Sequence, residues 1–242
     1  MYPGDMRMSS RNRWARTVGV LYLIFIFAGP LRLMVIPSRL FVKGDAATTT
    51  ANILAHEGLF RLGIATDVFI AALNVFVVLA IYRLFRDVSR SAALAMLTLG
   101  LMDTPLYMFT LANDSAVLLV AHLQPVAAGF NAAQQQALVA LFLGLHGQTV
   151  AAAEMFWGLW LLPLAVLVWR SGFMPRFIGA WLTLNGIAYV VWSLVALLAP
   201  DHESTIASWA FPCQLGELVF MLWLLIAGDW WGRRHNPDRK VF

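Results

Sequence analysis

Six long apolar runs decide what this chain can fold into. They cover roughly residues 14–36, 59–82, 91–111, 147–169, 176–199 and 209–229. Each is long enough for an α-helix to cross a bilayer core, which takes about 20 residues. Lipid offers no partners to backbone N–H and C=O groups, so such runs cross as helices. The sequence predicts an all-α integral membrane bundle of six transmembrane helices, with residues 1–242 forming one transmembrane domain.

The composition agrees with a membrane protein. Hydrophobic residues make up 60% of the chain and charged residues 12%, about half the charged share of a soluble domain. The formal net charge is +4, but the basic residues flank the apolar runs, so membrane lipids rather than nucleic acid are the expected partners. The single cysteine, Cys213, excludes an intrachain disulfide and a CxxC motif.

The segment 112–146 is the ambiguous part of the chain. Ala132–Leu145 has a helical pattern and continues into the fourth run. The combined helix is longer than a bilayer core, which predicts a kink near Gly144–Gly147 or an extension outside the membrane. A seventh crossing here would move the basic residues of the second half to the outer side, so six spans fit better.

The basic residues predict an orientation with both termini in the cytoplasm. Cytoplasmic loops of membrane proteins carry an excess of Lys and Arg. In a six-span arrangement 13 of the 17 lysines and arginines share one side. These are Arg7, Arg11, Arg13, Arg16, Arg83, Arg86, Arg90, Arg170, Arg176, Arg233, Arg234, Arg239 and Lys240. The outer side keeps Arg32, Arg39, Lys43 and Arg61.

The first outer loop, residues 37–58, is the only long one expected to have structure of its own. Asp45 or Thr48 is placed to cap a short helix that runs through Glu57. Gly58 is its expected end, because glycine commonly stops a helix.

Four carboxylates lie inside the apolar runs: Asp67, Asp103, Glu154 and Glu217. A charge at membrane depth costs several kcal/mol by most estimates, so such residues usually face a partner, a cavity or a pathway. Counting helix rise from the cytoplasmic edge puts all four roughly 18–22 Å deep. They are therefore expected to form one layer, contributed by four different helices.

Other polar residues extend this layer into a predicted site. Arg32, Arg61 and His56 lie above it as positive partners, and Asn74 shares a helix face with Asp67. Asn185 lies on one stripe with two aromatic residues. We expect these side chains to bound a polar cavity that opens to the outer side. The candidate ligand-binding residues are Asp67, Asp103, Glu154, Glu217, Arg32, Arg61, His56, Asn74 and Asn185.

No recognised motif assigns chemistry to this site. The chain has no Walker A loop, no GxGxxG and no HExxH, and its histidines lack metal-ligand spacing. No catalytic residue, metal or cofactor is therefore predicted, and the sequence indicates no oligomeric state.

Three functions remain open. The leading hypothesis is a non-enzymatic protein that binds or moves a small polar or amphipathic ligand through the cavity. An intramembrane lipid-modifying enzyme that uses the clustered carboxylates is the second. The third is a structural or assembly subunit whose charges fix helix packing. In that reading Arg32 or Arg61 neutralises Asp67, and Glu57 pairs with Arg61 one turn later.

Several segments together resemble one family. They are Gly44–Thr48 with Ala51–Ile53 and Leu59–Gly63, Ala80–Leu84, Phe156–Trp160 with Arg170–Phe173 and Pro175–Arg176, and Glu217 with Leu222–Leu225 and Gly228. In this order they resemble the bacterial domain-of-unknown-function 4386 family of multi-pass membrane proteins. The resemblance implies a multi-helix fold in a bacterial inner membrane, and it brings no activity and no catalytic residues.

Overall fold

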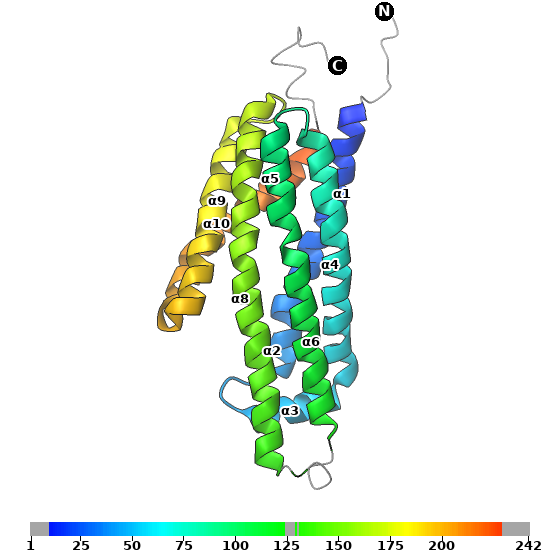
Figure 1. Ribbon diagram of the computed structural model, residues 1–242, viewed down its shortest axis with the longest axis vertical. Coiled ribbons are helices and arrows are strands. Elements are labelled where there is room, and N and C mark those ends of the chain that lie inside the picture. Colours follow the sequence, from blue (N-terminus) through cyan, green and yellow to red (C-terminus); the bar gives the residue numbers. More distant parts are fainter. Residues whose placement is uncertain (1–9, 124–128, 130, 229–242) are drawn as a thin grey trace, which may run out of the picture.

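Helices make up almost all of the described chain, and no strand occurs in it (Figure 1). The computed structural model describes residues 10–123, 129 and 131–228. Residues 1–9, 124–128, 130 and 229–242 lie outside the described part, and with them several basic residues on which the predicted orientation depends, among them Arg7 and Arg233.

Six spans occur among the described residues, as predicted. The first, Asn12–Leu40, joins α1 (Ser10–Pro30), the π-helix η1 (Leu31–Val35) and α2 (Ile36–Leu40). The second is α4 (Glu57–Phe85), and the third joins α5 (Arg90–Leu101) and α6 (Asp103–Ala121). The fourth is α8 (Ala132–Ser171) and the fifth is α9 (Arg176–Leu198). The sixth joins the 3-10 helix η2 (Pro200–His202) and α10 (Glu203–Ile226).

The ambiguous segment forms the ends of two long helices. Span three continues to Ala121 instead of ending near residue 111, and α8 runs unbroken through Gly144–Gly147 for 40 residues. At 1.5 Å per residue α8 is about 60 Å long, twice the bilayer core. The predicted kink near Gly144–Gly147 is therefore wrong, and the extension outside the membrane stays a prediction (Figure 1). Between α6 and α8 too few residues remain for a seventh crossing.

The first loop contains α3 (Ala46–Ala55), capped by Asp45 as predicted. The backbone N–H of Thr48 donates to Asp45 at 2.8 Å and the Thr48 hydroxyl donates at 2.7 Å. These bonds hold the pKa of Asp45 below its usual range. The predicted end was wrong: the helix stops at Ala55, and Gly58 lies inside α4. The chain turns at His56, whose N–H bonds to the carbonyl of Asn52.

Span three is broken where α5 meets α6. The chain leaves the helix at Met102, and Pro105 in the first turn of α6 has no N–H to donate to the preceding turn. The carbonyl of Gly100, just before the break, accepts a hydrogen bond from Nδ2 of Asn74 on α4, at 2.9 Å. A side chain of a neighbouring helix thus bonds the backbone beside the break, as is common where a membrane helix is interrupted.

Glycines allow the closest helix contacts. A Cβ built on Gly158 of α8 would lie 2.4 Å from the carbonyl oxygen of Gly186 on α9. A Cβ on Gly19 of α1 would lie 2.8 Å from the backbone nitrogen of Leu225 on α10. Small residues at such crossings are typical of membrane bundles, where van der Waals packing holds the helices together.

The buried residues form two apolar cores with a polar belt between them. The larger core contains residues such as Val18, Ile81, Leu164 and Phe220, near the end of the bundle where α1 begins and α10 ends. The smaller core lies around α3 and includes Ile53. On α4 the buried Thr66 and Asp67, and on α8 the buried Glu154, fall between the stretches that enter the two cores.

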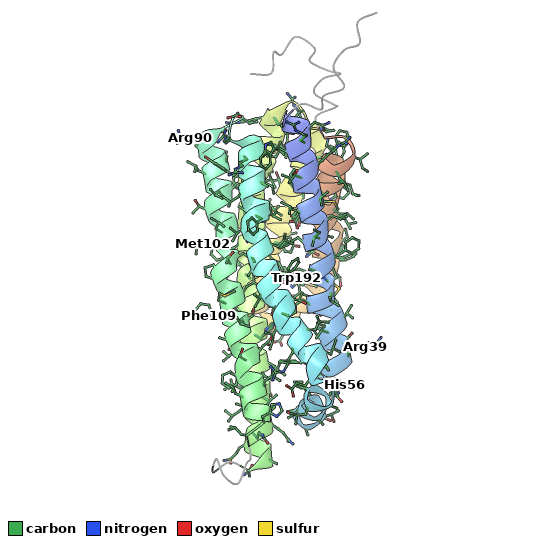
Figure 2. All side chains as sticks on the ribbon, turned by 90° about the vertical axis from the view of Figure 1, so that its right-hand side faces the viewer. Arg39, His56, Arg90, Met102, Phe109 and Trp192 are labelled. Atoms are coloured by element: carbon green, nitrogen blue, oxygen red, sulfur yellow. The ribbon has the colours of Figure 1, made fainter. Side chains whose placement is uncertain are left out.

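Apart from the buried Arg32, the described basic residues that the orientation prediction assigned to opposite sides lie toward opposite ends of the bundle. Figure 2 shows Arg90 at one end, and Arg39 and His56 at the other. An even number of spans returns the chain to the side on which it starts. Which end faces the cytoplasm stays a prediction.

Candidate functional site

The polar belt contains a cluster of charged residues around Arg32. The π-helical turn η1 directs Arg32 into the bundle, where it is 3% exposed, while the following Leu33, Met34 and Val35 face outward. Nε of Arg32 lies 2.8 Å from Asp67 on α4. Its Nη2 lies 2.5 Å from Asp114 on α6.

His146 on α8 completes this cluster. Its Nδ1 lies 3.0 Å from Oδ1 of Asp114, and its Nε2 lies 3.2 Å from Nη2 of Arg32. Four separate elements, η1, α4, α6 and α8, therefore meet at one guanidinium and two carboxylates. Such a network stabilises the bundle only while every partner is present, because each charge is removed from water.

The same cluster contains a set of potential metal ligands. Asp67, Asp114 and His146 bring one ligand atom each within 4.8 Å of one another. However, the guanidinium of Arg32 already binds both carboxylates. Arg32 therefore supplies the positive charge that a metal would supply, and the arrangement is that of a buried ion-pair network.

A separate cavity of about 340 Å³ lies beside this cluster, between α1, α4, α6, α8, α9 and α10. Its charged lining residues are Asp103 and Glu217, its amide residues are Asn74 and Gln214, and eight of its lining residues are aromatic. The aromatic residues are Tyr22, Phe25, Tyr107, Phe156, Trp157, Trp160, Tyr189 and Phe211. Among the residues that the structure describes, no Lys, Arg or His lines this cavity.

Each cavity carboxylate has a neutral hydrogen-bond donor. Nε1 of Trp157 donates to Oδ1 of Asp103 at 2.7 Å, and the hydroxyl of Tyr22 donates to Oε1 of Glu217. Tyr189 also interacts with Glu217. Among the described residues, no basic side chain forms an ion pair with either acid. The cavity therefore differs from the Arg32 cluster, where the acids are matched by a cation.

The aromatic rings of the cavity hold one another in fixed orientations. Trp157 and Tyr189 meet edge to face, with ring centroids 5.9 Å apart. Tyr22 and Trp160 do the same at 6.3 Å. Such pairs add stabilisation beyond simple burial and favour a preformed pocket. The electron-rich faces of these rings also attract cations.

The structure divides the predicted site residues among several environments. Of the four acids, Asp103 and Glu217 share the cavity, and Asp67 lies in the Arg32 cluster. Glu154 is buried on α8, within electrostatic reach of Glu203 at the start of α10.

The remaining candidates lie in and around the cavity or at the loop end of the bundle. Asn74 lines the cavity, and the fully buried Asn185 contacts Glu217 from outside the lining. Arg61 and His56 are exposed at the loop end. Arg61 pairs there with Glu57 at 2.6 Å, as predicted under the hypothesis of a structural subunit.

Sequence reasoning missed two residues of the cluster, Asp114 and His146. Asp114 falls in the stretch placed after span three, although it continues a buried stripe with Asp103, Thr110 and Val117 at spacings of seven, four and three residues. This helical spacing was the signal in the sequence that could have identified Asp114. His146 had no recognisable spacing, because its partners come from three other elements.

Comparison with known proteins identifies one match. The model of a family described as Domain of unknown function (DUF4386) matches residues 17–228. No curated protein and no solved structure matches the chain.

Proposed function

Because the chain belongs to the DUF4386 family, whose description names no activity, we propose its function from the cavity. We infer that the cavity binds a small organic cation with an apolar body. The proposal places this site in a protein of the bacterial cytoplasmic membrane, which binds or moves the ligand and does not react with it.

One observation carries this proposal: within the described part of the chain, the cavity has two carboxylates as its charged lining residues and no basic residue. Buried acids need either a proton or a cation, because an unpaired charge at membrane depth is costly. A cationic ligand supplies the missing charge to Asp103 and Glu217. An anionic ligand would have to reach Arg32, whose nitrogens already bind Asp67 and Asp114.

The remainder of the lining supports the same class of ligand. Trp157, Trp160 and Tyr189 offer ring faces, and cation–π contacts contribute about 0.5–2 kcal/mol each. The volume of about 340 Å³ lies at the small end of the range for ligand pockets. A substituted ammonium group with one apolar substituent matches both the chemistry and the size.

Binding of benzyltrimethylammonium to the purified protein in lipid nanodiscs tests this proposal. Neopentylbenzene has the same shape without the charge and serves as the matched neutral ligand. We expect the cation to bind and the neutral compound to bind at least about tenfold more weakly, a difference of about 1.4 kcal/mol. Asp103→Asn and Glu217→Gln should each weaken binding of the cation, and the double variant should abolish it.

Asp87→Asn is the control variant, because the Asp87 side chain is 88% exposed in the turn after α4. Its affinity should equal that of the native protein. Equal affinity for the charged and neutral compounds, or native affinity in the double variant, would refute a cation site. If the native protein binds no cation, and the Asp103→Asn and Glu217→Gln variants only lose thermal stability, the structural-subunit hypothesis is favoured.

A further inference from the structure

The cavity is not sealed by the bundle on the side of α1 and α10. Four large apolar residues line it and are also exposed on the outer surface of the helices. Leu33 and Met34 of η1 are 39% and 61% exposed, and Phe211 and Leu215 of α10 are 59% and 39% exposed. We call these four residues the portal.

The portal lies at the depth of the lipid tails. Leu215 is 11 residues from the end of α10 at Ile226 and 15 residues from Pro200, where its span begins. At 1.5 Å per residue it is therefore about 16 Å and about 22 Å from the two ends. A hydrocarbon core is about 30 Å thick. The portal thus opens into lipid and not into water.

The course of α1 and α10 explains why the opening exists. Near Gly19 and Leu225 the two backbones are in close contact, and the bond between Tyr22 and Glu217 joins the helices near mid-span. Farther along, α10 runs beside α9, while α2 lies behind α6 and α8 in the view of Figure 1. The two helices thus diverge away from their contact, and the portal residues come from η1, which follows α1, and from α10.

We propose that the ligand is a membrane-dissolved cationic amphiphile, whose head group lies in the cavity and whose alkyl tail leaves through the portal. This inference rests on the proposed cation site and adds the class of ligand and its route. The acids and aromatic rings surround the head, and the portal side chains border a tail that continues into the bilayer. A water-soluble cation needs no apolar opening at this depth.

Alkyltrimethylammonium ions of increasing chain length test the route. Each competes with benzyltrimethylammonium in nanodiscs, and its affinity is expressed per mole fraction in the membrane so that simple partitioning cancels. With an open portal, tetradecyltrimethylammonium should compete at least as well as hexyltrimethylammonium. A closed cavity of about 340 Å³ would force the longer chain to fold back on itself, at a cost in affinity. A loss of tenfold or more between the two would therefore overturn the proposal.

Gly29→Trp provides the complementary test. Gly29 lines the cavity next to the portal, and a Cβ built on it meets nothing within 4 Å, so the indole has room to enter the opening. We expect the affinity for the tetradecyl ion to fall at least tenfold relative to the hexyl ion. Met34→Trp narrows the portal from an exposed position and should act in the same direction.

Gly144→Trp is the matched control, because Gly144 of α8 also has nothing within 4 Å of its Cβ and does not line the cavity. It should leave the ratio of the two affinities unchanged. If Gly29→Trp and Met34→Trp leave that ratio at the native value, the portal is not the route of the tail. If benzyltrimethylammonium does not bind the native protein at all, the cation site itself fails, which is a different result.

Discussion

At the scale of single residues, the chain treats its buried acids in two different ways. Asp67 and Asp114 are matched by Arg32, so their charges are compensated inside the protein. Asp103 and Glu217 receive hydrogen bonds from Trp157 and Tyr22 but no positive charge. The charges of the first pair are therefore balanced within the protein, and the second pair is the one that we propose binds the ligand.

Asp114→Asn tests the structural half of this division. The change leaves Arg32 with one carboxylate in a nearly water-free site, and breaking a buried ion pair typically costs about 3–5 kcal/mol. We expect a clearly lower melting temperature in detergent, while affinity for benzyltrimethylammonium falls much less than in Glu217→Gln. A melting temperature equal to that of Asp87→Asn would show that the Arg32 cluster contributes no stability.

At the scale of helices, the contact between α8 and α9 depends on two glycines. Gly158→Ala places a methyl group 2.4 Å from the carbonyl oxygen of Gly186, so the helices must separate. Overpacking of this kind costs about 1–3 kcal/mol. We expect thermal unfolding to shift to lower temperature.

Gly147→Ala, in the same helix, is the control because nothing lies within 4 Å of its Cβ. It should be neutral or stabilising by up to about 1 kcal/mol, since alanine is the better helix former. If the two variants melt at the same temperature, the α8–α9 crossing is looser than described.

Beside the break in span three, the backbone receives a hydrogen bond from a side chain of another helix. Asn74→Leu removes the donor to the Gly100 carbonyl while keeping the volume similar. Side-chain hydrogen bonds between membrane helices average about 0.6 kcal/mol and reach about 1.7 kcal/mol. We expect a loss in that range by chemical unfolding. An unchanged stability would mean that the carbonyl finds another partner.

Element boundaries could be predicted only where the chain changes composition. The apolar runs identified all six spans, because membrane crossing requires a minimum length of apolar helix. The extension of α6 to Ala121 and the start of α4 at Glu57 escaped prediction, since both occur in mixed sequence. The π-helical turn at Leu31–Val35, which directs Arg32 inward, has no sequence signature beyond the preceding proline.

At the scale of the whole molecule, the sequence predicted the depth of the buried polar residues. It did not predict how they divide between the Arg32 cluster and the cavity. Helix rise placed the four acids at similar depth, but depth does not determine the direction in which each side chain points. Rotation about each helix axis sends Asp67 to Arg32 and sends Asp103 and Glu217 to the cavity. That rotation is set by contacts between helices, which no single run of sequence contains.

The orientation in the membrane is also a prediction for the whole molecule. In a Cys213→Ser background, Lys43→Cys and Asp87→Cys place single thiols in the turns that follow span one and span two, which lie at opposite ends of the bundle. A membrane-impermeant thiol reagent applied to intact spheroplasts should label the first and not the second. If the reagent labels the second thiol and not the first, the orientation predicted from the basic residues is wrong.

The most direct test of the account is to locate a bound cation. A crystal of the complex with 4-bromobenzyltrimethylammonium would show the bromine by its anomalous scattering. We predict a single strong peak inside the cavity, with the ammonium group between Asp103 and Glu217 and against the rings of Trp157 and Tyr189. A peak at another place, or an empty cavity at saturating concentration, would contradict the claim that these two acids are kept for a cationic ligand.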